Sequence, residues 1–459
     1  MIINKKNYQI FSSLLFVVAI ASATTTAEAQ TKVFDLTRQQ PEYNDSTGYG
    51  YDINNKSRQP GEGFYFSVKV PDGNYRVTVS LGSRKHRAVT CVRAESRRLM
   101  VENCMTRKKE QKVFTFVVNK RSPYISEKMR VKLKPREHDY LNWDDRLTLE
   151  FSGENPAVAS IKIDPADDVR TVYLCGNSTV VDQENEPYAS WGQMITRWFG
   201  QQVAISNHAE SGLTAGSFLA GNRLEKILTT LKKGDYVVCE FGHNDQKEKT
   251  AGAGAWFNFQ YNLKIFIDKV REKGGKIIFC TPTQRRAWDK EQKNIVETHA
   301  DYPDAMRDVA RRENVPVIEI HDMTRTFFET LGYEDSKKSL VHYPAGTWPG
   351  QEKDLADNTH FNPYGAYEVA KMVVMGMKEL QLEGLAENII PEWKDYDPAQ
   401  PDDPSTFKWY PATKRDAAKP DGNCPTRQLL KGRPWDWILS TNSISSHRHT
   451  KCEAKLHVA

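Results

Sequence analysis

The feature of this sequence that most constrains its fold is an alternation of short apolar runs with longer helical stretches between residues 172 and 380. The apolar runs have the length and composition of buried strands and lie at 172–175, 202–206, 235–241, 276–281 and 315–320. The stretches predicted as helices are 190–199, 222–231, 258–273, 304–313 and 363–380. Such alternation is typical of a parallel sheet covered on both faces. We therefore expect an α/β domain over residues 170–385, with a flavodoxin-like, doubly wound sheet of five parallel strands.

Residues 31–165 show a different pattern, in which apolar and polar residues alternate over short runs separated by turn residues. Strands are predicted at 63–70, 75–81, 113–118, 130–133, 147–151 and 158–163. The turn at 71–74 is expected to join the first two strands as a hairpin. This pattern predicts an N-terminal β-sandwich domain, which ends at the Asp-Pro-Ala-Asp-Asp sequence of residues 164–168. Its role stays open between binding carbohydrate and serving as a packing or spacer domain.

The first 29 residues have the features of an export signal. Lys5 and Lys6 precede a short apolar segment at 11–20, and Ala27 and Ala29 form a small-residue cleavage site. The apolar segment is too short to span a membrane. We therefore expect an exported protein that is free in the periplasm or outside the cell.

Residues 391–459 form a C-terminal extension rich in Pro, Asp and Lys. Trp393, Trp409 and Tyr410 are expected to hold its first part against the surface of the protein. From about residue 425 the chain is basic, rich in His and without clear apolar periodicity, so this part is expected to be disordered.

Charge and cysteine content limit the classes of partner. The formal net charge is +5 over 459 residues, and no dense run of Lys and Arg indicates binding to nucleic acid. The seven cysteines include no Cys-x-x-Cys pair, so we expect neither a metal nor a cofactor. Cys91 and Cys104 lie close together in sequence and could form a disulfide or remain two reduced core thiols. The oligomeric state stays open.

Polar residues follow the predicted strands at the points where the strands end. Ser178 comes after the first strand, residues 207–212 after the second and residues 242–245 after the third. Residues 357–363 follow the last strand and precede the final helix. Because the carboxyl ends of parallel strands meet at one edge of a sheet, these four loops are expected to converge.

The residue types in these loops are those that acyl transfer requires. A serine hydroxyl is a weak nucleophile that needs a base, and a carboxylate holds that base in its reactive tautomer. Asp357 and His360 are three residues apart, which lets Asp357 reach Nδ1 of His360 while Nε2 faces Ser178. The N–H groups of Ser178 and Gly212 and the side-chain amide of Asn244 could together bind an oxyanion.

Three phrases carry a resemblance to a known family: Val172 to Thr179, Phe241-Gly242-His243-Asn244-Asp245, and Asp357 to Asn362. With them the sequence resembles the SGNH (GDSL-type) hydrolases, and more narrowly their rhamnogalacturonan acetylesterase branch, over about residues 170–385. The resemblance implies Ser178, Gly212, Asn244 and His360 as the four family residues, and deacetylation of a pectic polysaccharide as the activity. The N-terminal region also resembles galactose-binding-like modules. The sequence departs from the family where Asn177 replaces the Asp of Gly-Asp-Ser.

Other residues have weaker assignments. Trp256 could stack on a sugar ring or belong to the core, and Arg285, like Arg286, could pair with a substrate carboxylate or lie on the surface. His243 is expected to pack beside Asn244, and a metal site made of Asp357, His360 and His243 is the less favoured reading.

The function predicted from the sequence is that of a secreted serine esterase that acts on acetylated plant cell-wall polysaccharide, with neither nucleic acid nor membrane as a partner. Acetylxylan, another glycan or a lipid ester are alternative substrates. A carbohydrate-binding protein without activity is the alternative from another class.

Overall fold

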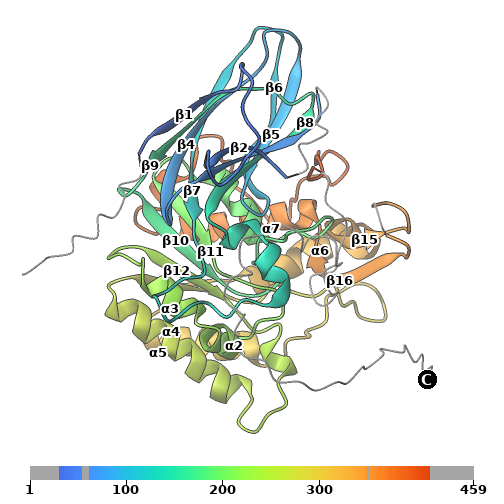
Figure 1. Cartoon of the computed structure of the whole chain (residues 1–459). Helices are drawn as coiled ribbons and strands as arrows, with labels where there is room; N and C mark the ends of the chain where they lie inside the picture. Colours follow the sequence, from blue (N-terminus) through green and yellow to red (C-terminus); the bar gives the residue numbers. More distant parts are fainter. Residues whose placement is uncertain (1–29, 54–60, 349–350, 414–459) are drawn as a thin grey trace, which may run out of the picture.

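A computed structural model describes residues 30–53, 61–348 and 351–413 of the chain (Figure 1). The predicted export signal and the segment 414–459 lie outside the described residues. Within the described residues, no helix combines the length and the apolar character that crossing a membrane would require.

The N-terminal region forms two antiparallel sheets. The first has the order β1-β9-β4-β7, and the second β2-β3-β8-β5-β6. The bounds are Lys32–Asp35 (β1), Tyr49–Asp52 (β2), Phe64–Lys69 (β3), Gly73–Leu81 (β4), Ala88–Ala94 (β5), Arg98–Thr106 (β6), Lys112–Lys120 (β7), Arg146–Glu154 (β8) and Val158–Pro165 (β9). Phe66, Val92 and Leu149 of the second sheet share a buried cluster with Val77 and Ile161 of the first. The two sheets therefore pack face to face around one apolar core.

Two predictions for this region are wrong. The expected hairpin of 63–70 with 75–81 does not form, because β3 pairs with β2 and β8 while β4 pairs with β7 and β9. The turn at 71–74 instead carries the chain from one sheet to the other. The expected strand at 130–133 is also absent, and this segment runs beside the second region, with Lys132 N donating to Gly221 O at 3.0 Å.

The second region is built on five parallel strands in the order β11-β10-β12-β13-β14. Their bounds are Arg170–Cys175 (β10), Val203–Asn207 (β11), Tyr236–Glu240 (β12), Lys276–Cys280 (β13) and Val317–Ile318 (β14). All five coincide with predicted strands. Numbered in chain order, the five strands lie in the order 2-1-3-4-5. The first strand, β10, which ends before Ser178, therefore lies between the second strand, β11, and the third strand, β12. In such sheets, ligands bind where the strand order reverses.

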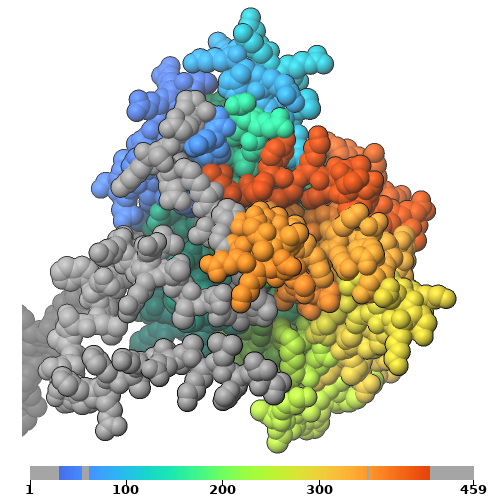
Figure 2. All heavy atoms as spheres, turned by 90° about the vertical axis from the view of Figure 1, so that its right-hand side faces the viewer, coloured from blue at the N-terminus to red at the C-terminus, as the bar shows by residue number. Residues whose placement is uncertain are grey.

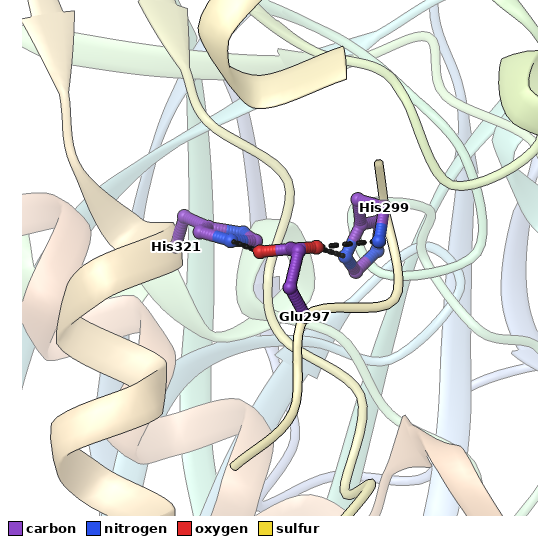
Figure 3. A group of neighbouring side chains, drawn as sticks. All are labelled: Glu297, His299 and His321. Atoms are coloured by element: carbon purple, nitrogen blue, oxygen red, sulfur yellow. Dashed lines mark hydrogen bonds and ion pairs between the residues drawn. The ribbon is translucent and has the colours of Figure 1, made fainter. Parts of the chain in front are cut away.

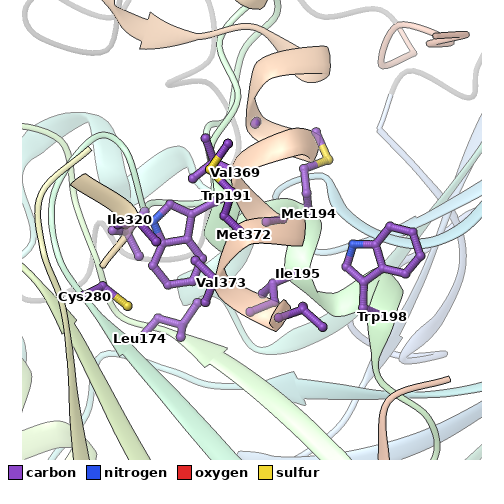
Figure 4. Close-up of a cluster of buried hydrophobic side chains, with 14 of the residues drawn as sticks. Leu174, Trp191, Met194, Ile195, Trp198, Cys280, Ile320, Val369, Met372 and Val373 are labelled. Atoms are coloured by element: carbon purple, nitrogen blue, oxygen red, sulfur yellow. The ribbon is translucent and has the colours of Figure 1, made fainter. Parts of the chain in front are cut away.

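Helices pack against this sheet in two groups. The helices are Trp191–Met194 (α1), Ala215–Ala220 (α2), Arg223–Leu228 (α3), Gln260–Glu272 (α4), Tyr302–Glu313 (α5), Ile320–Asp335 (α6) and Pro363–Glu379 (α7). Side chains of α1, α6 and α7 share one cluster with Leu174 and Cys280, as Figure 4 shows around Trp191. Side chains of α2 to α5 share another with Tyr173 and Phe279. Neighbouring residues of one strand point to opposite faces, which explains the two clusters.

The sequence did not predict α2, α6 or the antiparallel pair β15 (Leu340–Tyr343) and β16 (Leu355–Phe361). Asp357 and His360 therefore lie on strand β16 and not on a loop. The expected helix at 190–199 is present as α1 followed by a 3₁₀ turn, Ile195–Trp198.

Residues 391–413 run over the outside of both regions, and Figure 2 shows their red surface between the blue N-terminal sheets and the orange and yellow surface of the second region. Tyr364 Oη donates to Asp402 O at 2.6 Å, and Tyr410 Oη donates to Glu154 Oε1 of β8 at 2.8 Å. The Arg93 guanidinium stacks 4.2 Å from the centre of the Trp409 ring. The expectation that Trp409 and Tyr410 hold this segment to the surface is confirmed.

The five cysteines within the described residues are free. Cys91 packs into the buried cluster that contains Leu174 and Trp191, whereas Cys104 packs into the core between the two N-terminal sheets. The two side chains therefore leave opposite faces of the same sheet, and the disulfide left open by the sequence does not form.

Candidate active site

Ser178 lies in the tight turn that follows β10. Gly176 allows this turn, because a Cβ at that position would lie 2.5 Å from Val180 Cγ2 and 2.9 Å from Glu240 O. The Ser178 side chain is mostly buried, and its carbonyl accepts a hydrogen bond from Gln183 Nε2 at 2.7 Å. The turn therefore fixes the serine at the carboxyl edge of the sheet.

Asp357, His360 and Ser178 form a continuous hydrogen-bonded chain. His360 Nε2 lies 2.9 Å from Ser178 Oγ, and His360 Nδ1 lies 2.7 Å from Asp357 Oδ2. A carboxylate can only accept, so Nδ1 carries the proton and Nε2 is left to accept from the serine hydroxyl. The predicted residues are thus brought together in the arrangement that nucleophilic catalysis by serine requires.

Asp357 is held as a carboxylate. Burial alone would raise its pKa, but the hydrogen bond and charge of His360 and the backbone N–H groups of His360 and Thr359 lower the pKa to about 2. These N–H groups donate to Asp357 Oδ1 at 3.0 and 2.8 Å. Asp357 therefore stays ionised over the whole physiological range and orients the imidazole.

The loops that carry the predicted oxyanion donors are tied to one another. Gly212 has a φ of +79°, a conformation that favours glycine, and Glu210 N donates to Gly176 O at 3.3 Å. Asn244 Nδ2 donates to Leu213 O at 3.1 Å, and Lys247 Nζ donates to Asn244 Oδ1 at 3.0 Å. Gly212 and Asn244 are thus neighbours beside the serine turn, and one amide hydrogen of Asn244 finds no acceptor among the described residues.

Asn177, the departure from the family pattern, keeps the local turn. Its Oδ1 lies 3.2 Å from Thr179 N and 2.9 Å from Thr179 Oγ1, as an aspartate oxygen could. The Thr179 hydroxyl also lies 2.8 Å from Glu240 Oε1. Burial raises the pKa of Glu240 to about 7, although hydrogen bonds from Trp191, Thr179 and Thr283 oppose the shift.

The two arginines considered for substrate binding support loops in this structure. Arg285 donates to His243 O at 3.0 Å and to Thr298 O at 3.2 Å, which braces the loop that carries Asn244. Arg286 Nη1 donates to Asn358 Oδ1 at 3.2 Å, which braces β16.

Trp256 is half exposed. Its Nε1 donates to Asp301 Oδ2 at 3.0 Å, beside a pocket of about 370 Å³ lined by residues 254–257 and 300–302. The exposed part of the ring is available to a ligand.

Glu297, His299 and His321 form a group of polar side chains that the sequence did not reveal (Figure 3). His321 Nε2 lies 2.7 Å from Glu297 Oε2, and His299 Nδ1 lies 3.4 Å from Glu297 Oε1. His299 Nε2 in turn lies 3.0 Å from His243 Nδ1. Burial lowers the pKa of His299 to about 4, although Glu297 opposes the shift. His243 therefore belongs to this group, whereas Asp357 and His360 belong to the serine.

Glu297, His299 and His321 are spaced so that they could together contact one cation. No sequence pattern indicates this group, because Glu297 and His321 are 24 residues apart and lack the short spacing of a ligand motif. The less favoured metal reading, Asp357 with His360 and His243, is not the group that the structure assembles.

One cation from the N-terminal region also lies here, and the sequence did not reveal it either. Lys134 Nζ donates to Ser211 O and lies 3.3 Å from the position that a Cβ on Gly212 would take.

The ring of Tyr188, on the loop after Ser178, packs edge-on against His360 with 5.8 Å between ring centres.

Residues 174–366 match the model of the GDSL-like lipase/acylhydrolase family. The chain is 40% identical over 213 residues to the rhamnogalacturonan acetylesterase RhgT of Bacillus subtilis strain 168, covering 46% of this chain and 90% of the relative. It is 30% identical to the probable rhamnogalacturonan acetylesterase YesY of the same organism, covering 48% of this chain and 98% of the relative. The uncharacterized esterase YxiM, also from that organism, is 25% identical and is matched over 70% of this chain and 75% of its own length.

Proposed function

The chain belongs to the GDSL-like lipase/acylhydrolase family, in its rhamnogalacturonan acetylesterase-like branch, and we propose that it is a secreted serine esterase that removes O-acetyl groups from a pectic polysaccharide, with rhamnogalacturonan as the preferred substrate. The observation that carries the proposal is the hydrogen-bonded chain from Asp357 through His360 to Ser178.

Acylation begins at Ser178. His360 Nε2 accepts the proton of the Ser178 hydroxyl as Oγ attacks the acetyl carbonyl, and Asp357 stabilises the imidazolium that forms. The carbonyl oxygen becomes an oxyanion, which the N–H groups of Ser178 and Gly212 and the amide of Asn244 stabilise. The imidazolium then gives its proton to the sugar oxygen as the C–O bond breaks, which leaves an acetyl group on Ser178.

Deacylation repeats these steps with water. His360 accepts a proton from water, the hydroxide oxygen attacks the acetyl carbonyl, and the same donors hold the second oxyanion. Proton return from His360 to Ser178 Oγ releases acetate. Each proton in this cycle moves between atoms of the chain, the sugar and water, so the cycle requires no cofactor.

The export signal predicted for residues 1–29 favours secretion, and a polysaccharide of the plant cell wall is met outside the cell. The nearest alternative is the same chemistry on acetylxylan or another acetylated glycan. A binding protein without activity is disfavoured by the complete chain of Ser178, His360 and Asp357.

The test is acetate release from acetylated rhamnogalacturonan and acetylated xylan by the purified protein, with Ser178→Ala as the control. We expect faster release from the pectic polymer and none from the Ser178→Ala variant above background. Equal release from both polymers would contradict the pectic assignment but keep the serine esterase. A folded wild-type protein that releases acetate from neither polymer would overturn the esterase proposal for glycans.

A further inference from the structure

A segment of the N-terminal region reaches the edge of the candidate active site. Between β7 and β8, the chain passes along the second region and forms a short 3₁₀ turn, Pro135–Asp139. Glu137 in this turn is fully buried and accepts from Arg223 Nη2 at 2.5 and 2.7 Å. This ion pair anchors the turn to helix α3. The turn also holds the backbone of Lys134, whose N–H donates to Glu137 Oε2 at 2.8 Å.

Lys134 brings a cation next to a predicted oxyanion donor. Its ammonium donates to Ser211 O and lies beside Gly212, 3.3 Å from the position that a Cβ on Gly212 would take. An ammonium has three N–H donors, and Ser211 O is the acceptor found for it within the described part of the chain. Two donors are therefore available to a ligand.

The charges around Lys134 do not cancel. Glu137 is paired with Arg223, and Glu210 is paired with Arg136, whose Nε lies 2.9 Å from Glu210 Oε1. In the ranges 30–53, 61–348 and 351–413, no carboxylate forms an ion pair with Lys134. Three cations thus face two carboxylates, and the surplus positive charge is on Lys134.

The Lys134 ammonium is poorly solvated. Burial lowers the pKa of Lys134, the charge of Glu210 opposes this shift, and the charge of Arg136 adds to it. A carboxylate that arrives from solution would offset these effects, and a charge-assisted hydrogen bond in a partly desolvated site is stronger than one at an exposed position.

We propose that Lys134 binds the carboxylate of a uronic acid unit at or beside the acetylated sugar, and so selects acidic over neutral acetylated glycans. The proposal rests on the proposed function, since it assigns the substrate preference of that same site. The acetyl carbonyl meets Gly212 and the carboxylate meets the ammonium that lies over Gly212, so both groups come from the same or the adjoining sugar unit. The N-terminal region then takes part in recognising the substrate instead of acting only as a spacer.

Variants at position 134 test this directly. Lys134→Met keeps most of the side-chain volume and removes the charge, and Lys134→Arg keeps the charge. Lys132→Met is the matched control, because Lys132 is an exposed lysine two residues away in the same segment. The substrates are acetylated rhamnogalacturonan oligosaccharides, the same oligosaccharides with reduced carboxyl groups, acetylated xylo-oligosaccharides and p-nitrophenyl acetate.

For Lys134→Met we expect kcat/KM on the acidic oligosaccharides to fall by about tenfold to a hundredfold, as for loss of a charge-assisted contact. The values for the three uncharged substrates should stay within about twofold, since they lack the partner group. Lys134→Arg should keep part of the preference, and Lys132→Met should keep all of it.

An unchanged ratio of acidic to neutral kcat/KM in a folded Lys134→Met protein would overturn the inference. An equal loss on all four substrates would also overturn it, because it would assign Lys134 to the oxyanion or to the fold. Wild-type activity on p-nitrophenyl acetate without any acidic preference would overturn the inference and leave the esterase intact. Wild-type protein that cleaves no ester at all would overturn the proposed function itself.

Discussion

Arg98 of strand β6 and Asp182 of the loop after Ser178 form an ion pair in which neither side chain has any solvent exposure, with 2.7 Å between Nε and Oδ2. The pair joins the N-terminal sheets to the loop that carries the candidate nucleophile. Its remaining groups are satisfied, because Arg98 also donates to Asn119 O at 2.9 Å and Asp182 Oδ1 accepts from Asn207 Nδ2 at 2.8 Å. The two regions are therefore coupled through a buried polar network and not only through apolar contact.

Removing one partner of this pair should destabilise the whole protein. Arg98→Met leaves Asp182 buried without its cation, so we expect the free energy of unfolding in urea to fall by about 3–5 kcal/mol. Arg107→Met, which changes an exposed arginine just after β6, should alter it by less than about 0.5 kcal/mol. A loss below about 1 kcal/mol for Arg98→Met would contradict the coupling.

Asp357→Asn should separate orientation from binding. The amide no longer holds His360 in the tautomer with the proton on Nδ1, so we expect kcat to fall by about a thousandfold to ten-thousandfold with KM nearly unchanged. Steady-state kinetics on acetylated oligosaccharide measure both constants. Glu352→Gln, an exposed change shortly before β16, serves as the control. A variant that keeps more than a tenth of wild-type kcat would remove Asp357 from the mechanism.

Asn244→Ala should weaken stabilisation of the oxyanion. Loss of one such donor lowers kcat by about a hundredfold to a thousandfold, with little effect on KM. The variant also frees Leu213 O from its hydrogen bond, so thermal unfolding must be measured beside the kinetics. If kcat is unchanged in a folded variant, the oxyanion is held by backbone N–H groups alone.

Glu240 should make stability depend on pH. Its pKa is raised to about 7 in the folded protein and is near 4.5 in the unfolded chain. Between these values the folded state holds a proton that the unfolded state has released, so stability falls as pH rises from about 4.5 to 7 and is level above that. We expect this carboxyl to account for about 3 kcal/mol at most.

Urea unfolding of wild-type protein and Glu240→Gln at pH 4.5 and pH 8 isolates this effect from that of other carboxyls. The variant should gain stability relative to wild type as pH rises. A difference between the two proteins that stays the same at both pH values would show that the pKa of Glu240 is not raised in the folded protein.

Chelation should leave the activity unchanged, because every proton in the proposed cycle moves between Ser178, His360, the substrate and water. We expect kcat/KM after treatment with EDTA to equal that of untreated protein. Two results together would instead assign a cation to Glu297, His299 and His321. EDTA would inactivate the wild-type protein and Zn²⁺ would restore its activity, whereas a His299→Ala variant would be inactive even with Zn²⁺.

The sequence predicted the central sheet well because each of its strands is buried on both faces and therefore forms a continuous apolar run. The prediction failed for elements in which burial does not produce a continuous apolar run. Strand β5 is also buried on both faces, but Arg93 within it pairs with Glu150, so the run looked polar. Helix α6 begins two residues after β14, so its first turn was assigned to the strand.

The candidate site was predictable to the extent that its residues follow strand ends. Ser178, Gly212, Asn244 and His360 are each next to such an end or to a helix start. Lys134 was not predictable, because it is 77 residues from Ser211 and only the packing of the two regions brings the two together. Sequence patterns report periodicity over neighbouring residues, so they do not reveal a contact between two residues that are far apart in the chain.

The position of Asn177 has a consequence for how sequences of this kind can change. Asn177 and Glu240 both face the hydroxyl of Thr179, and Glu240 is fully buried. An aspartate at 177 would set a second carboxylate beside the first, and two buried carboxylates that share one partner cannot both ionise without a large cost. An aspartate at 177 can therefore ionise only while Glu240 keeps its proton, which couples the choice of residue at 177 to the protonation of Glu240.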